Sequence, residues 1–175
     1  MVGIVYNLEG YSQGLLTGAP ALGVGTTFAV PSNPNVALAV MDDDGFLSGD
    51  AASNDLADDA SGQTADITVD GLPAGNGGKI YAETLWTVTD GSNTFLLVEI
   101  EQEGLATDYF SFIDIAPAAG FPNPGAMIEV LASANVDTQL LPYGNIGTPS
   151  DIPLVATMPL LLAGLAALTT RRRRS

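Results

Sequence analysis

The sequence predicts an all-β protein: an antiparallel β-sandwich or jelly-roll-like domain followed by a C-terminal hydrophobic helix. Short segments alternate apolar and polar residues, and Gly, Pro, Asn and Asp separate these segments. No long amphipathic helical pattern lies between them, which favours a sandwich. We expect a β-rich domain at 1–139, a linker at 140–151 and a membrane-directed tail at 152–175.

The composition excludes several classes of function. The 175 residues include 20 acidic and only five basic ones, and four of the basic ones are the arginines at 171–174. Such an acidic body repels nucleic acid, so we expect no nucleic-acid partner. Cysteine and histidine are both absent, which removes thiolate chemistry and the commonest general base. Hydrophobic residues make up 46% of the chain, which is enough for a folded core.

The first half of the domain contains predicted strands on either side of an acidic loop. Residues 1–30 are mildly apolar and broken by glycines, as is typical of an early strand and loop. Residues 34–41 predict a buried strand, and a second strand from Thr64 ends at the Asp70–Gly71 turn. Between them, residues 42–63 are rich in Asp, Asn, Ser and Gly, which favour turns.

The clearest local pattern is a β-hairpin at residues 79–103. Period-two alternation gives its first strand two faces: Ile80, Ala82, Thr84, Trp86 and Val88 on one, and Tyr81, Glu83, Leu85, Thr87 and Thr89 on the other. Asp90 and Gly91 form the turn. If Glu99 and Glu101 face water, the inward residues of the return strand are Leu96, Val98 and Ile100.

Two further strands complete the predicted domain. They lie at 107–115 and 126–136, and the loop between them contains three prolines. Propensity alone would also allow a helix at 126–136, but the β surroundings and the length favour a strand. Residues 140–151 are rich in Pro, Gly, Asn and Ser, which indicates a linker.

The tail carries an uncharged run that ends in the arginines. The 19 uncharged residues 152–170 would span about 28 Å as one helix, close to the roughly 30 Å of a bilayer core. Pro153 and Pro159 argue against a continuous helix, so we place its start near Pro159. Arginines are held at the cytoplasmic face, which would leave the acidic body outside the cytoplasm. A C-terminal core helix is the alternative, but residues 159–168 show no polar face.

This Pro-containing box, apolar helix and terminal arginine cluster resemble the C-terminal sorting signals of the PEP-CTERM class in Gram-negative bacteria, most closely the VPLPA variety. The box residues are Ile152, Pro153, Leu154, Val155 and Ala156, and the cytoplasmic anchor is Arg171, Arg172, Arg173 and Arg174. Valine stands where that variety has its second proline. The resemblance implies export, a transient inner-membrane anchor, and cleavage near the box by an exosortase-type protease. Release to the cell surface or the exopolysaccharide matrix would follow.

Two further expectations concern the rest of the chain. Proteins of this class normally begin with a secretory signal, whereas residues 1–30 lack the basic and compact apolar regions of one. We therefore expect that the true start lies upstream or that the chain is truncated. The body, including DYFSFIDI, also resembles β-rich segments that precede Hint self-processing domains in some marine alphaproteobacterial proteins. Without cysteine, no Hint chemistry is available.

An acidic loop and a row of glutamates are the candidate sites. We expect no cofactor, and calcium is the alternative. Calcium takes about six to eight oxygen ligands, and the loop offers a dense set of carboxylates: Asp42, Asp43, Asp44, Asp50, Asp55, Asp58 and Asp59, beside Asn54. The spacing is not that of an EF-hand, and a solvated acidic loop is the simpler interpretation. Glu99, Glu101 and Glu103 share a strand face, as solubilising residues usually do. Trp86, Tyr81 and Tyr109 could stack on sugar rings or belong to the core.

These observations favour a non-enzymatic, exported protein of the cell surface or extracellular matrix. The alternative is a calcium-dependent carbohydrate-binding or adhesive β-sandwich module delivered by the same tail. An enzyme that uses the glutamate row is the third interpretation, because a glycosidase needs two carboxyls placed across a cleft.

Overall fold

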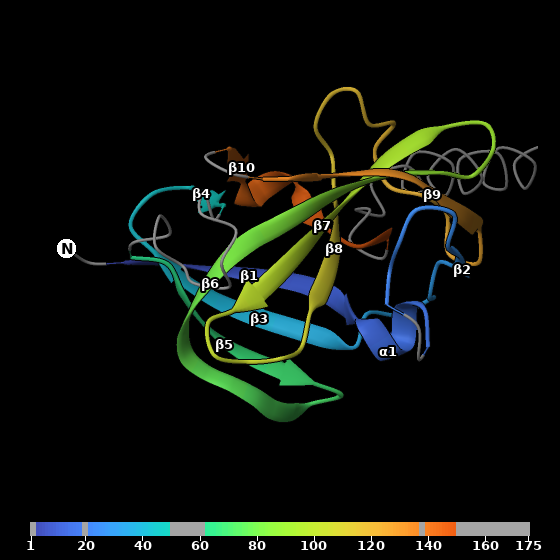
Figure 1. Ribbon diagram of the computed structural model, residues 1–175. Coiled ribbons are helices and arrows are strands. Elements are labelled where there is room, and N and C mark those ends of the chain that lie inside the picture. Colours follow the sequence, from blue (N-terminus) through green and yellow to red (C-terminus); the bar gives the residue numbers. More distant parts are fainter. Residues whose placement is uncertain (1–2, 19–20, 50–61, 137–138, 150–175) are drawn as a thin grey trace, which may run out of the picture.

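The computed structural model describes residues 3–18, 21–49, 62–136 and 139–149, and these residues are predominantly β (Figure 1). The all-β prediction is therefore confirmed. The helical elements are α1 (Gln13–Leu16) and the 3-10 turn η1 (Tyr143–Asn145). The strands are β1 (Ile4–Ser12), β2 (Thr27–Ala29), β3 (Val36–Asp42), β4 (Phe46–Ser48), β5 (Thr64–Val69), β6 (Leu72–Thr89), β7 (Thr94–Gln102), β8 (Tyr109–Ile113), β9 (Met127–Asn135), β10 (Leu140–Pro142) and β11 (Ile146–Gly147).

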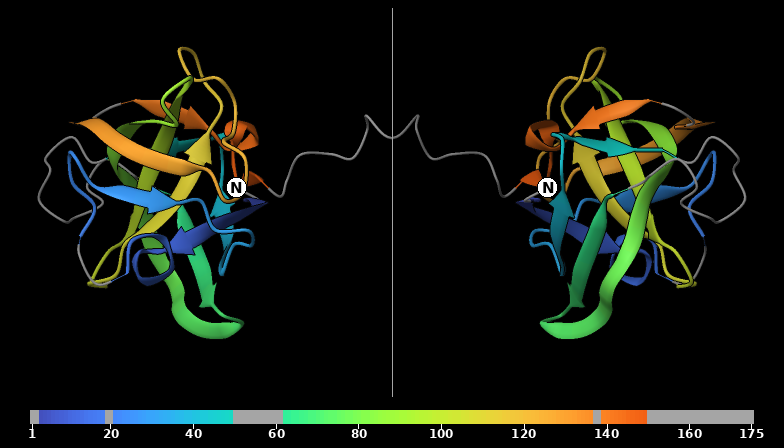
Figure 2. Two further views of the ribbon diagram at one scale, coloured as in Figure 1. Left: turned by 90° about the vertical axis from the view of Figure 1, so that its right-hand side faces the viewer. Right: turned by 90° about the vertical axis from the view of Figure 1, so that its left-hand side faces the viewer.

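The strands close into an antiparallel barrel, which corrects the predicted sandwich or jelly-roll. β1 pairs with β3, β3 with β5, β5 with β6, β6 with β7, and β7 with β8. β8 then returns to β1 through the pairs Tyr11–Phe110 and Ser12–Tyr109. In the side views of Figure 2 these strands surround a common interior. Alternating patterns look alike in a sandwich and a barrel, and only this long-range pairing distinguishes the two.

Strand β6 serves two parts of the barrel. Its first half pairs with β5 up to the Thr64–Lys79 pair, and its second half pairs with β7 from Ile80 onward. The edge that β5 no longer covers is taken by β9, which pairs with residues 84–89 of β6 and itself pairs with β2. The hairpin predicted at 79–103 and the strand predicted at 126–136 are therefore both confirmed.

A β-bulge in β6 corrects the predicted faces of this strand. The register shifts between Ala82 and Leu85, so that two residues of β6 lie opposite Glu99 of β7. Leu85 consequently packs against the same core as Ile80 and Ala82, whereas Trp86 turns to the other side of the sheet. A strict period of two predicts the reverse for Leu85 and Trp86.

The protein has two hydrophobic cores because β7 and β8 are covered on both faces. The first core lies inside the barrel and receives residues from every barrel strand, including the predicted inward residues Leu96, Val98 and Ile100. The second core lies on the outer side of β7 and β8, where Leu97, Phe110 and Phe112 pack with α1, β2 and β9. The nearly continuous apolar runs of β7 and β8 follow from this double burial.

The stretch predicted as a linker belongs to the barrel as far as residue 149. β10 pairs with β4, and β11 pairs with β8. Leu141, Tyr143 and Ile146 are buried in the interior core. The β structure therefore continues beyond the predicted boundary at 139.

The predicted tail, with its helix, lies outside the described residues. Across the described ranges, none of the helices has the length and apolar character that crossing a membrane requires.

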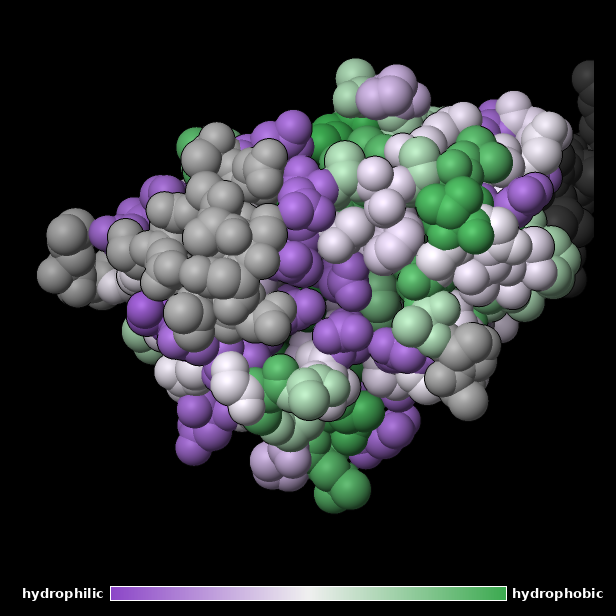
Figure 3. All heavy atoms as spheres, in the orientation of Figure 1, coloured by the Kyte–Doolittle hydropathy of each residue, from purple (hydrophilic) through white to green (hydrophobic). Residues whose placement is uncertain are grey.

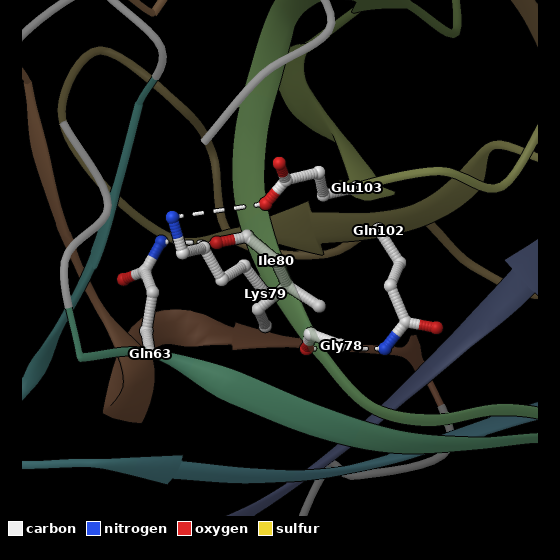
Figure 4. Close-up of polar contacts among 6 residues, drawn as sticks. All are labelled: Gln63, Gly78, Lys79, Ile80, Gln102 and Glu103. Atoms are coloured by element: carbon white, nitrogen blue, oxygen red, sulfur yellow. Dashed lines mark hydrogen bonds and ion pairs between the residues drawn. The ribbon is translucent and has the colours of Figure 1, made fainter. Parts of the chain in front are cut away.

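Two buried glutamines bond to main-chain carbonyls where β6 changes partners (Figure 4). Gln102 Nε2 donates to the oxygens of Ala65, at 2.8 Å, and Gly78, at 3.1 Å. Gln63 Nε2 donates to the oxygens of Ile80, at 2.6 Å, and of Ser48. Both side chains are at most 3% exposed, so water cannot replace these donors. Together they join β4, β5, β6 and β7.

Glycine at position 78 leaves room for Gln102. A Cβ atom at residue 78 would lie 2.8 Å from the Cγ, Cδ and Nε2 atoms of Gln102. Because the glutamine is buried and bonded, it cannot move aside without losing its hydrogen bonds. Packing against Gln102 therefore explains why glycine stands at positions 75 and 78 of β6.

We predict that Gln102→Ala lowers the free energy of unfolding by about 2–4 kcal/mol, because two buried carbonyls lose their donor. Gly78→Ala lowers it by a similar amount through the clash with Gln102. The double variant should lose less free energy of unfolding than the two single variants together, because without the Gln102 side chain the added Cβ at residue 78 meets no clash. Urea unfolding of all three variants measures this coupling.

Gly144→Ala is the matched control, because a Cβ there meets no atom within 4 Å. Strictly additive losses at residues 78 and 102 would contradict the assignment.

Candidate functional site

Three carboxylates converge on the outer face of β7 and at the start of β8. Glu99 and Glu101 project from the side of β7 opposite Val98 and Ile100, which face the interior. The last ladder pair between β7 and β8 is Ile100–Tyr109. Asp108 immediately precedes Tyr109 in the chain, and Glu101 immediately follows Ile100, so the two carboxylates lie side by side. Oxygen atoms of the three side chains lie within 4.8 Å of one another. We call Glu99, Glu101 and Asp108 the carboxylate cluster.

Neighbouring strands supply hydrogen-bond donors to this cluster. Trp86 Nε1 donates to Glu99 Oε2 at 3.0 Å, and Tyr81 Oη donates to Glu101 Oε2 at 2.7 Å. Thr84 also hydrogen-bonds to Glu99. The bulge in β6 is the cause of this arrangement, because it turns Thr84 and Trp86 to the same side as Glu99.

The cluster favours a bound proton. The pKa of Glu99 is raised to about 7, chiefly by burial and also by the charges of Asp108 and Glu101, and the hydrogen bonds from Thr84 and Trp86 oppose this rise. Burial also raises the pKa of Tyr109, with a smaller contribution from Asp108. Calcium takes about six to eight oxygen ligands, whereas the cluster offers three side chains. We therefore interpret it as a proton-sharing group.

An open pocket of about 570 Å³ lies next to the cluster. Its lining includes Tyr81, Glu101, Glu103, Leu105 and Asp108. Glu103 belongs to the pocket but not to the cluster, because its carboxylate pairs with Lys79 Nζ at 3.7 Å. The predicted row of three glutamates is thus divided, and Asp108 takes the third place in the cluster. Only the pairing of β7 with β8 brings Asp108 there, and no local sequence pattern signals it.

Two of the predicted calcium ligands have partners within the protein. Asp42 is 4% exposed, and its carboxylate accepts from Tyr143 Oη and from the amide of Asp43, both at 2.7 Å. Asp44 accepts from the amide of Phe46 at 2.7 Å. Burial and the Asp42 charge raise the pKa of Tyr143, so its hydroxyl remains a donor. Asp50, Asn54, Asp55, Asp58 and Asp59 lie outside the described residues.

The aromatic candidates belong mainly to the cores. Tyr81 and Tyr109 are each 1% exposed, and Trp86 packs against the outer core. Stacking of either tyrosine ring on a sugar would require this packing to open. The box residues 152–156 and the arginines 171–174 lie outside the described residues, so their roles stay predictions.

The fold and the cluster define a class: a closed, antiparallel β-barrel that carries a half-buried carboxylate cluster on its outer face. Compared with models of protein families, with curated proteins and with solved structures, the chain showed no match.

We predict that Glu99 lowers stability as the pH rises from about 4.5 to about 7. Its pKa is higher in the folded protein than in the unfolded chain, so folding favours the protonated form. The loss is complete above pH 7 and reaches about 3 kcal/mol. Glu99→Gln should remove this pH-dependent loss. The free energy of unfolding of the variant, measured with urea, should therefore rise relative to that of the wild type between pH 5 and pH 8.

Glu129→Gln, on β9 and away from the cluster, is the control. A difference between wild type and Glu99→Gln that stays constant with pH would contradict the prediction.

Proposed function

We propose that this chain is an exported cell-surface or extracellular-matrix protein of a Gram-negative bacterium. A C-terminal membrane signal sorts it, and an exosortase-type protease cleaves that signal. The observation that carries the proposal is the charge asymmetry of the sequence: four of its five basic residues follow directly after an uncharged run. Arginines in that place hold a tail at the cytoplasmic face while the body lies beyond the membrane.

The barrel suits the part that such a process would release. It is a closed unit whose interior is filled by its own side chains. Lys79 is the only basic residue among those the structure describes, and it pairs with Glu103. Figure 3 shows a band of hydrophilic residues down the middle of this face, with more apolar residues above, below and to the right of it. So acidic a surface is repelled by anionic lipid and remains hydrated. We assign the body a non-enzymatic role.

The sorting proposal predicts two forms of the protein in a host with an exosortase-type protease. The full-length form is in the membrane fraction, and a form that ends near residues 152–156 is in the medium. Replacing Arg171–Arg174 with Gln should remove the membrane form, because nothing then retains the tail at the cytoplasmic face. Fractionation and mass spectrometry of the C-terminus measure both effects.

Lys79→Gln, which removes the remaining basic residue, is the matched control and should behave like the wild type. Released protein that still ends at Ser175, or no effect of the arginine changes, would contradict the proposal.

A calcium-dependent carbohydrate-binding or adhesive module is the second candidate. The open pocket beside Tyr81, Glu101 and Glu103 favours it, because carboxylates there could accept hydrogen bonds from sugar hydroxyls. Calcium would bind separately, in the acidic loop at 42–63.

This candidate predicts that calcium raises the melting temperature, because the ion binds the folded protein and not the unfolded chain. The rise should disappear when Asp50, Asp55, Asp58 and Asp59 are replaced with Asn. It should persist in Tyr143→Phe, which removes the hydroxyl that holds Asp42 but keeps every carboxylate. If calcium leaves the melting temperature of the wild type unchanged, the calcium-dependent module is excluded.

A further inference from the structure

The connection between β7 and β8, residues 103–108, is held at its two ends and by one turn, in which the amide of Leu105 donates to the oxygen of Gln102 at 3.0 Å. At the first end Glu103 pairs with Lys79, and its amide donates to the Lys79 oxygen at 2.9 Å. At the other end Asp108 belongs to the carboxylate cluster. Residues 104–107 between these ends are exposed. The connection also lines the open pocket, through Gly104, Leu105 and Ala106.

The end at Asp108 depends on groups that repel one another. Around Glu99, β7 contributes Glu101, and β6 contributes Thr84 and Trp86, with Glu83 beside Thr84 in the bulge. Tyr81 of β6 donates to Glu101. Tyr109 of β8 lies in the interior core, and the charge of Asp108 contributes to raising its pKa. The connection contributes Asp108, and Glu103 beyond it. Within the described ranges Lys79 is the one basic side chain, and it is engaged with Glu103. A proton is therefore the available source of neutralisation.

We propose that the carboxylate cluster is a proton-operated latch for the β7–β8 connection. While the cluster holds one proton it carries two negative charges, and Asp108 stays beside Glu99 and Glu101. Release of that proton to solvent leaves three negative charges at close range. The connection then moves away from β7, and the pocket widens.

The packing on each side of the cluster shows which part would move. β7 and β8 are paired from Leu96–Ile113 to Ile100–Tyr109, and Tyr109 is 1% exposed in the interior core. Beyond that pair, residues 104–107 are exposed, and Gly104 has a φ of 82°, where glycine is favoured. The connection can shift without breaking the core. The raised pKa of Glu99 puts the transition near neutrality.

Hydrogen exchange of residues 104–108 tests the latch on the intact chain. Protection factors, corrected for the intrinsic pH dependence of exchange, should fall about tenfold between pH 6 and pH 8.5, because one ionisation occurs in that interval. In Glu99→Gln the fall should be absent. Asp108→Asn provides a second variant with the same expectation, and Glu129→Gln, outside the cluster, should keep the fall.

Equal protection of the wild type at both pH values would overturn the latch, as would a fall that persists in both Glu99→Gln and Asp108→Asn. Near-UV circular dichroism of Trp86 shows that each variant has folded. The latch lies within the barrel, so its failure would leave the proposed sorting by the tail unaffected.

Discussion

Hydrogen bonds from two buried glutamines hold the junction on which the closed barrel depends. At this junction β6 leaves β5 and continues beside β7, and the β5–β6 register is irregular. Gln102 bonds to the oxygens of Ala65 and Gly78, and Gln63 bonds to that of Ile80. A buried carbonyl without a donor costs about 1–3 kcal/mol. The glutamine side chains avoid this cost, because they donate to the carbonyls at the point where β6 changes partner.

The same junction is connected to the start of the acidic loop and to the carboxylate cluster. Gln63 Oε1 is 3.4 Å from Tyr143 Oη, which also donates to Asp42 at the start of the acidic loop. Tyr143 stacks on Tyr6, with ring centroids 4.5 Å apart, and Tyr6 Oη donates to the oxygen of Asp44. On the other side of the junction, β6 continues into the bulge that directs Trp86 to Glu99. The junction thus contacts the start of the acidic loop, and the bulge that follows it in β6 positions the donors of the carboxylate cluster.

The sequence predicted the local elements well because their causes are local. The turn at Asp70–Gly71 has both residues at positive φ, as its composition indicates, and the alternation in β3 corresponds to alternate burial. Closure of β1 on β8 depends on pairs about 100 residues apart along the chain, which period-two patterns do not encode. Residues 140–149 resemble a linker by composition, although Leu141 and Tyr143 are buried.

The candidate site was only partly predictable for the same reason. Glu99 and Glu101 are apparent as a same-face pair, but their separation from Glu103 depends on Lys79, and their approach to Asp108 depends on strand pairing. The bulge opposite Glu99 follows no sequence signal that we recognise. It decides whether Trp86 faces the cluster, and therefore whether a tryptophan reports on it.

Native-state hydrogen exchange at the junction tests the structural account most directly. If the buried glutamines hold the barrel closed, the amides of Ile80 and Glu103, which donate to the oxygens of Gln63 and Lys79, exchange only through global unfolding. Their exchange free energy then equals that of complete unfolding and falls linearly with denaturant at the global slope. Exchange of these two amides by local opening, while the interiors of β3 and β7 stay protected, would contradict the account.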